Sequence, residues 1–301
     1  MKTPAVLLFL LLCSVASFGQ QVADPDFDTK VARPAYTSKG PKVLFDEAHF
    51  NFHTTTGRYQ PFAALLSSDG YQITPNKQKF ARQTLAGFAV LVIANALGAA
   101  QMNAPSASQP AFTEEECAAV KEWVSAGGAL LLIADHAPMG AAAERLGLQF
   151  GVEMSKGHTS DPAHYFKESN NPGFIQFNRE NGLLGDHAIT RGRNKDEQIT
   201  RIQSFTGQSL KGPKESVALL KLADSARDLN PETKAQASAA GRAQGIALPF
   251  GKGRVVMMGE AAMLSAQLAG PQKMKFGMNQ PGLDNRQFAL NVMHWLTGIL
   301  Q

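Results

Sequence analysis

The stretch that decides the fold is AFTEEECAAVKEWVSAGGALLLIADHAPMG, residues 111–140. Thr113 and Glu116 have the spacing of a capping box, which predicts the start of a helix because each side chain can accept the other residue's backbone N–H. Glycines at 127–128 predict its end, since glycine adopts the backbone conformation of a helix terminus at little cost. The continuous apolar run at 129–134 is typical of a strand covered on both faces.

The alternation of strands and helices continues along the chain. Further strands are predicted at 42–45, 71–74 and 90–95, and as a hairpin at 245–249 and 254–258. Further helices are predicted at 59–66, 140–146 and 285–297. This alternation favours a mainly parallel sheet with helices on both faces, so the fold class is predicted as α/β.

Residues 1–19 have the parts of a secretory signal peptide. Lys2 provides the basic start, residues 5–12 form a short apolar run, and small residues stand at the cleavage positions. The run is too short to span a bilayer as a helix. We therefore expect a secreted or periplasmic protein without a membrane span.

The rest of the chain is expected to be one domain behind a short leader. Residues 20–40 are polar and contain prolines, which predicts a flexible leader. Residues 41–301 are predicted to form a single α/β domain. Within that domain, 151–200 is rich in Gly, Asn, Asp and His and has few apolar runs, which predicts an irregular insertion.

The charge pattern does not favour a nucleic-acid partner. Removal of the signal peptide lowers the formal net charge only from +4 to +3, because Lys2 is its one charged residue. The remaining basic residues form no stripe of the kind that binds a phosphate backbone. Cysteine usage also excludes an intramolecular disulfide, because only Cys117 remains after Cys13 leaves with the signal peptide.

Residues 46–49 read DEAH, the four letters of a helicase ATPase box. An ATPase also needs a phosphate-binding loop of the pattern GxxxxGK[ST] before that box. No such loop precedes Asp46. The match is therefore a coincidence, and we do not expect a helicase or an ATPase.

Polar residues follow the ends of several predicted strands, and these ends meet at one edge of a parallel sheet. Asp46, His49 and His53 carry the carboxylate and imidazole groups that bind zinc or a similar divalent metal, so they are candidate metal ligands. The candidate catalytic residues are Asp135, His136 and Glu260. The candidate substrate-binding residues are Asn51, Phe52 and Asn95.

Two other interpretations of these residues stay open. The same groups could line a hydrogen-bonded, sugar-type pocket that contains no metal. Alternatively, Asp46 and Asp135 could accept hydrogen bonds from loop backbone, as Asp often does after a strand.

Several stretches together carry a family resemblance. They are DEAHFNFHT (46–54), VLVIANAL (90–97), residues 111–140, DHAITRG (186–192), SFTGQSL (204–210), GKGRVVMMGEAAML (251–264) and DNRQFALNVMHWLTG (284–298). The chain resembles, over about residues 41–300, secreted bacterial proteins of unknown function in the class I glutamine amidotransferase-like superfamily. Its relatives there include ThuA-like domains and the GIFT domains of gliding-motility and intraflagellar-transport proteins. The resemblance implies a flavodoxin-like three-layer sandwich.

The chain departs from that superfamily's amidotransferases at the nucleophile. A glutamine amidotransferase carries a Cys on a tight turn after a strand, whereas the strand ends here carry Asn95, Asp135, His136 and Glu260. Glutaminase activity is therefore not expected. Two functions remain: a metal-assisted hydrolase for a small polar or carbohydrate-like substrate, and a non-catalytic module that binds carbohydrate or a cell-envelope partner. The oligomeric state stays open.

Overall fold

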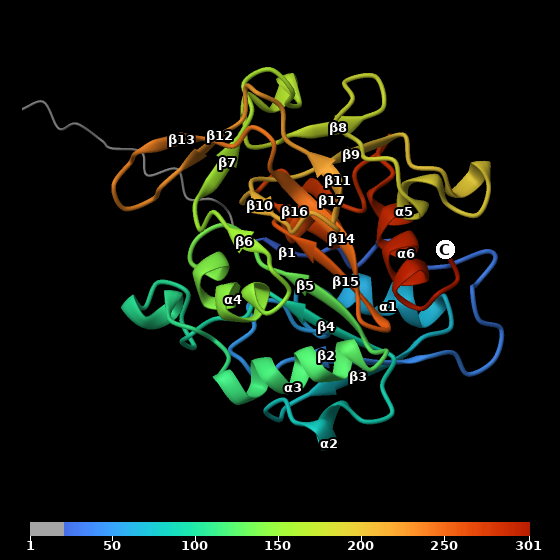
Figure 1. The fold of residues 1–301 in the computed structure, drawn as a ribbon. Coiled ribbons are helices and arrows are strands. Elements are labelled where there is room, and N and C mark those ends of the chain that lie inside the picture. The colour runs from blue at the N-terminus through green and yellow to red at the C-terminus, as the bar shows by residue number, and fades with distance from the viewer. Residues whose placement is uncertain (1–20) are drawn as a thin grey trace, which may run out of the picture.

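The computed structural model describes residues 21–301, so the predicted signal peptide at 1–19 lies outside the described residues. A nine-stranded sheet runs through this part of the chain (Figure 1). Its parallel strands are, in spatial order, β3 (Gln72–Asn76), β2 (Lys42–Asp46), β4 (Val90–Ala94), β5 (Ala129–Ile133) and β15 (Gly253–Met258). The antiparallel pairings that follow involve β14 (Ala243–Phe250), β10 (Leu210–Lys211), β6 (Glu153–Met154) and β11 (Val217–Lys221). The predicted α/β fold with a mainly parallel sheet is confirmed.

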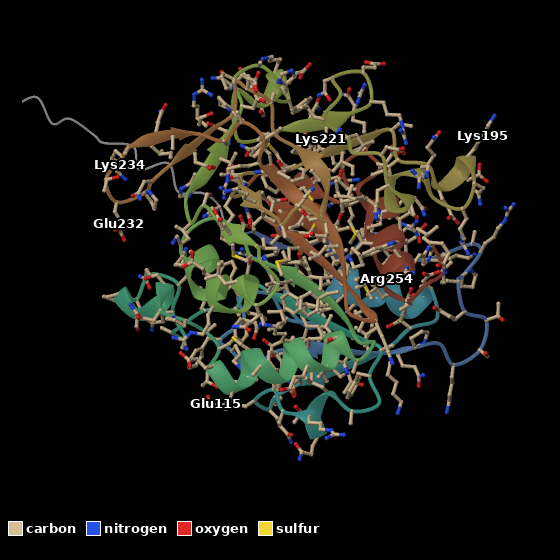
Figure 2. All side chains as sticks on the ribbon, viewed as in Figure 1. Glu115, Lys195, Lys221, Glu232, Lys234 and Arg254 are labelled. Atoms are coloured by element: carbon tan, nitrogen blue, oxygen red, sulfur yellow. The ribbon has the colours of Figure 1, made fainter. Side chains whose placement is uncertain are left out.

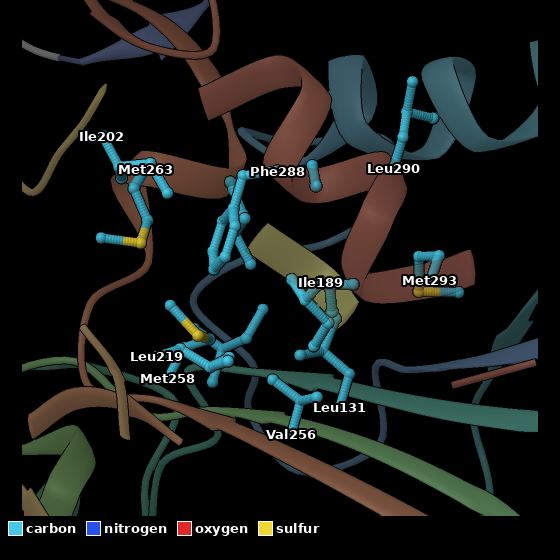
Figure 3. Packing of buried hydrophobic residues seen from close by; sticks show 14 of the residues in the cluster. Leu131, Ile189, Ile202, Leu219, Val256, Met258, Met263, Phe288, Leu290 and Met293 are labelled. Carbon is cyan, nitrogen blue, oxygen red and sulfur yellow. The ribbon is translucent and has the colours of Figure 1, made fainter. Parts of the chain in front are cut away.

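Helices cover both faces of this sheet because its central strands are apolar on both sides. Leu130 and Leu132 of β5 pack in one core with α3 (Glu114–Ser125) and α4 (Met139–Leu148). Leu131 and Ile133 pack in the other core with α1 (Gln60–Ser68) and α6 (Asn285–Leu296). Figure 3 shows Phe288 of α6 pointing toward β15 in this second core.

The decisive stretch folds as its sequence predicts. Thr113 accepts a hydrogen bond from the Glu116 N–H at 3.3 Å, and Glu116 Oε2 accepts one from the Thr113 N–H at 3.0 Å. Cys117 is buried on the apolar face of α3. The predicted hairpin is also present, because β14 and β15 pair through Phe250 and Gly253 at its turn.

The remaining elements are short. Small sheets are formed by β1 (Val22–Ala23), β16 (Ala266–Ala269) and β17 (Met274–Gly277), by β7 (His158–Ser160), β12 (Arg227–Leu229) and β13 (Gln236–Ser238), and by β8 (Gln176–Asn178) and β9 (Arg201–Gln203). The remaining α-helices are α2 (Arg82–Leu85) and α5 (Ala188–Arg191). Single 3-10 turns lie at Pro105–Ser108, Lys167–Ser169, Lys195–Glu197 and Ala262–Leu264. Between 151 and 200 the described chain thus holds only short elements.

Residues 21–40 lie against the domain at several points. Val22 and Ala23 pair with β16, and the Ala35 N–H donates to Asp69 Oδ1 at 2.7 Å. Tyr36 packs edge-on against Tyr71, with ring centroids 5.2 Å apart. The flexibility of the predicted leader stays a prediction. Along residues 21–301, no helix combines the length and the apolar character needed to cross a membrane.

Candidate functional site

His49 links two carboxylates at the carboxyl end of β2. Its Nδ1 lies 2.9 Å from both oxygens of Asp46, and its Nε2 lies 2.8 Å from Glu116 Oε1. All three side chains are buried. Asn51 Nδ2 donates to Asp46 Oδ2 at 2.9 Å, so the loop after β2 folds back onto the strand end.

The carboxylates keep His49 protonated more strongly than a free imidazole. Burial by itself would lower the pKa of His49, but hydrogen bonds and charge attraction from Asp46 and Glu116 outweigh burial and raise it. Burial has the opposite effect on a carboxyl group and by itself would raise the pKa of Glu116. The Thr113 and Phe80 N–H groups and His49 nevertheless hold the pKa of Glu116 below its ordinary value. Both ring nitrogens of His49 thus face carboxyl oxygens, an arrangement that favours the protonated ring.

The predicted metal ligands do not fit a metal ion in this arrangement. A metal ligand needs a free ring nitrogen, and both nitrogens of His49 face carboxylate oxygens. His53 instead stacks on Tyr59, with ring centroids 4.7 Å apart. Within residues 21–301, no group of three or more His, Cys, Asp or Glu side chains is placed to hold a metal. Asp46 and His49 are brought together, but as an ion pair.

The loop after β2 continues to His53 and its neighbours. His53 Nδ1 is buried without a hydrogen-bond partner, and burial, helped by Arg58, lowers the pKa of His53 to about 3. Phe52 lies under the Arg58 guanidinium at 4.6 Å. The Tyr59 hydroxyl donates to the Ala261 carbonyl at 2.6 Å, which ties the start of α1 to the loop after β15.

The candidate catalytic residues meet at the carboxyl ends of β4, β5 and β15. Asn95 has a left-handed backbone with φ of 53°, and its Oδ1 accepts the Asp135 N–H at 3.0 Å. Asp135 Oδ1 accepts the His136 N–H at 2.7 Å and lies 3.9 Å from His136 Nε2. Burial raises the pKa of Asp135, and attraction from His136 offsets only part of that effect.

Glu260 lies fully buried beside Asp135. Burial and then the Asp135 charge raise its pKa well above the ordinary value. Both oxygens accept backbone hydrogen bonds, from the Ala262 N–H at 2.7 Å and the Met263 N–H at 2.8 Å. Gly207 passes so close that an added Cβ would lie 2.7 Å from the Glu260 Cβ, so only glycine fits there.

His136 is the most exposed member of this group. Its side chain is 31% exposed, against 13% for Asp135. Its ring stacks on that of His158, with centroids 4.3 Å apart, and burial followed by repulsion from His136 lowers the pKa of His158. His158 had only weak support in the sequence, because nothing local to β7 indicates a contact with β5.

A cavity of about 520 Å³ opens beside His49. The exposed Phe50 and Lys79 and the half-buried Arg145 contribute to its wall, and Glu116 belongs to its lining. Figure 2 shows the neighbouring Glu115 at the start of α3, pointing away from the protein. The sequence indicated Glu116 only as a helix cap, so its contact with His49 was missed.

Asp161 and His164 of the insertion also come together with Ser225, which follows β11, but not as a catalytic triad. Asp161 accepts hydrogen bonds from Ser225 Oγ at 2.6 Å and lies 3.0 Å from His164 Nδ1. Ser225 Oγ lies 3.5 Å from that same Nδ1. A triad needs the serine and the carboxylate on opposite ring nitrogens, so this cluster serves to anchor the loop.

Comparisons with known proteins define the fold rather than an activity. No protein-family model and no curated protein matches the chain. Among solved structures it is similar to the mmIFT52 N-terminal domain, with a TM-score of 0.60 and 18% identity over 85% of this chain and 97% of that one. At this identity the likeness shows a shared fold.

Two further solved structures match this chain with lower TM-scores. A cytoplasmic protein from Salmonella typhimurium has a TM-score of 0.48 and 10% identity, over 85% of this chain and 98% of that one. A putative ThuA-like protein from Parabacteroides merdae has a TM-score of 0.46 and 13% identity, over 87% and 91%. ThuA-like proteins are therefore among the structural neighbours of this chain, whose own sheet and helices make it a mixed α/β protein with a large, mainly parallel sheet.

Proposed function

We propose that this protein is a secreted hydrolase of the class I glutamine amidotransferase-like superfamily, acting on a small polar or carbohydrate-like substrate. The signal-peptide features of residues 1–19 support export. Helices on both faces of a mainly parallel sheet support a flavodoxin-like three-layer sandwich. The resemblance of the stretches quoted above to ThuA-like and GIFT domains supports the superfamily.

One observation carries the proposed activity: the accessible imidazole of His136 lies beside the half-buried Asp135, and the buried Glu260 influences Asp135, at the carboxyl ends of the strands. Ligands of open α/β sheets bind at this edge. His136 reaches solvent, so it would take a proton from the attacking water. Asp135 beside it would stabilise the imidazolium that forms. Neighbouring carboxyl groups resist ionising together, so the charge of Asp135 adds to the effect of burial and raises the pKa of Glu260 well above its ordinary value.

Glu260 has a different role from the one its sequence position suggested. It was a candidate base, but it is fully buried and both its oxygens accept backbone N–H groups. It therefore acts on Asp135 as a positioning residue and does not contact the substrate. No metal step belongs to this proposal, because His49 has no free ring nitrogen.

The test begins with a panel of chromogenic esters, amides and glycosides. For any substrate that the protein hydrolyses, His136→Ala should lower kcat by about 10²- to 10⁴-fold, the usual contribution of a general base. Asp135→Asn should lower kcat and flatten its pH profile. The control is His164→Ala, whose imidazole is similarly exposed and also lies beside an aspartate. Hydrolysis that His136→Ala leaves unaltered would refute the assignment.

A non-catalytic binding module is the second candidate, and the cavity beside His49 favours it. None of Asp135, His136 and Glu260 lines this cavity, whereas Phe50 is 56% exposed and offers a flat apolar face. Stacking on an aromatic ring together with a few polar groups is typical of small-ligand sites. A glycan array decides between the two: binding that Phe50→Ala abolishes and His136→Ala preserves, without any hydrolysis, supports the module.

A further inference from the structure

A second cavity, of about 330 Å³, lies at the opposite edge of the sheet. Asp69, which lines it, caps the end of α1 in the short turn that leads into β3, so the cavity lies at the amino ends of the strands. The proposed catalytic residues lie at the carboxyl ends. The two sites therefore lie at opposite ends of the parallel strands. Neither site depends on the other.

Three arginines from distant parts of the chain converge on this cavity. Arg33 comes from the leader, Arg193 from the loop before the 3-10 turn Lys195–Glu197, and Arg286 from α6. A guanidinium group suits carboxylate and phosphate oxygens because its N–H groups form a planar fork. The convergence is not a local sequence feature, since 253 residues separate the first arginine from the last.

Two of these arginines keep free donors. Arg286 uses Nε and Nη2 on the backbone carbonyls of Asp28 and Lys30, at 3.4 and 2.7 Å. Burial lowers the pKa of Arg286, and attraction from Asp28 and Asp69 compensates only in part. Within residues 21–301, Arg33 takes part in no ion pair or side-chain hydrogen bond. Both groups therefore have hydrogen-bonding capacity that the protein does not use.

The acidic residues of the wall are largely committed elsewhere. Glu197 is held by Arg193 through both of its oxygens. Asp69 accepts from the Ala35 N–H at 2.7 Å and lies 2.7 Å from His294 Nε2. Asp196 alone remains, and it is exposed. Arg33 and Arg286 thus face one uncommitted carboxylate between them.

His294 adds a polar atom that the fold leaves without a partner. It is 1% exposed and lines the cavity. Its Nε2 faces Asp69, but its Nδ1 is buried without a hydrogen-bond partner.

We propose that this cavity binds a small molecule through a carboxylate or phosphate group, which Arg33 and Arg286 hold. The volume suits a small metabolite rather than a polymer, because ligand pockets begin at roughly 300 Å³. The site is independent of the hydrolase proposal.

Calorimetric titration of the purified protein tests the site, with inorganic phosphate in one series and citrate in the other. Ionic strength is matched with sodium chloride, so that general screening is the same throughout. We expect saturable binding of at least one anion. Arg33→Gln should weaken it by about tenfold or more, the loss expected for a charge-assisted hydrogen bond. This variant removes no hydrogen bond or ion pair of residues 21–301.

Arg82→Gln is the matched control, because Arg82 is an exposed arginine of α2 on the other face of the sheet. It should bind the anion as the parent protein does. Binding of phosphate alone or citrate alone would identify which oxyanion the site prefers. No saturable binding of either anion, or equal weakening in both variants, would overturn the proposal.

Discussion

At the scale of single residues, His49 acts as a structural cation. Buried charges are tolerated when each has a partner, and His49 supplies one to Asp46 and Glu116 together. Phe80 and Phe112 pack against its ring, with centroids 4.7 and 4.8 Å away, and help to bury it. The carboxylate and imidazole groups that suggested a metal site thus serve as hydrogen-bond and charge partners for one another.

Replacing His49 with alanine should therefore destabilise the fold strongly. Two buried carboxylates would lose their shared cation, a loss of about 3–5 kcal/mol in the free energy of unfolding. Urea unfolding at pH 6 measures it. His164→Ala is the control, because its 31% exposed ring lets water replace the contact with Asp161, and it should cost about 1 kcal/mol or less. Equal losses in both variants would contradict a buried ion bridge.

The same bridge predicts how stability depends on pH. Because the pKa of His49 is raised above its ordinary value of 6.5, its stabilisation is fully present below that pH and is lost as the pH rises through the raised value. Because the pKa of Glu116 is lowered from 4.5, its stabilisation is present above that pH and is lost as the pH falls through the lowered value. The stability difference between the parent protein and His49→Ala should peak between these two values. Denaturation curves across pH 3 to 9, roughly the range of ordinary carboxyl and imidazole titration, would show a flat difference if the bridge were absent.

At the scale of elements, the capping box of α3 serves two purposes. Glu116 Oε2 caps the helix through the Thr113 N–H, while Oε1 accepts the Phe80 N–H and contacts His49. One side chain thus joins the helix start, the segment before α2 and the end of β2. A capping box is visible in the sequence. The partners of the other carboxylate oxygen of Glu116, however, are decided only when the elements pack.

Variants within this first turn should separate the two purposes. Thr113→Ala removes the cap alone and should cost about 1 kcal/mol. Glu116→Ala also leaves His49 with one carboxylate, so it should cost about 3 kcal/mol or more. Glu115→Ala is the control, since that side chain points to solvent (Figure 2) and only its interaction with the helix start is lost, so stability should change less than in either other variant. Thermal and urea unfolding measure all three; similar losses for Thr113→Ala and Glu116→Ala would mean that Glu116 is only a cap.

At the scale of the whole molecule, the leader closes one side of the domain. Asp24 Oδ2 accepts from Asn279 Nδ2 at 2.8 Å, and the Val31 N–H donates to Ser68 Oγ at 3.0 Å. The Ala35 N–H reaches the buried Asp69. These contacts span the ends of the chain, so the leader contributes to the stability of elements that follow it by more than 200 residues.

Deleting residues 21–36 should lower the stability of the domain. Each lost hydrogen bond is worth about 1 kcal/mol, and Asp69 would lose a donor while it remains buried. Unfolding curves of the deleted and full chains give the difference. Amide hydrogen exchange of Ala35 in the full chain provides the control, because a docked segment protects this N–H. Unchanged stability with fast exchange would instead support the flexible leader that the composition predicts.

Much of the architecture was predictable, because it depends on neighbours in sequence. Apolar runs at 90–94 and 129–133, the cap at Thr113 and the hairpin at 250–253 each reflect local hydrogen bonding and periodicity. The convergence of polar residues at strand ends was also predictable in outline, since parallel strands end at one edge. The role of these residues at that edge was less predictable. The same side chains can bind a metal, a substrate or each other.

The sequence by itself determined the alternating α/β order and the stretches whose ends carry polar groups, because backbone propensity and apolar period act over a few residues. Only the tertiary structure decided the partners. Glu116 meets His49 across 67 residues, and His136 stacks on His158 of a different sheet. Such pairs depend on how whole elements pack. A buried charge pairs with the counter-charge that this packing brings within hydrogen-bonding distance.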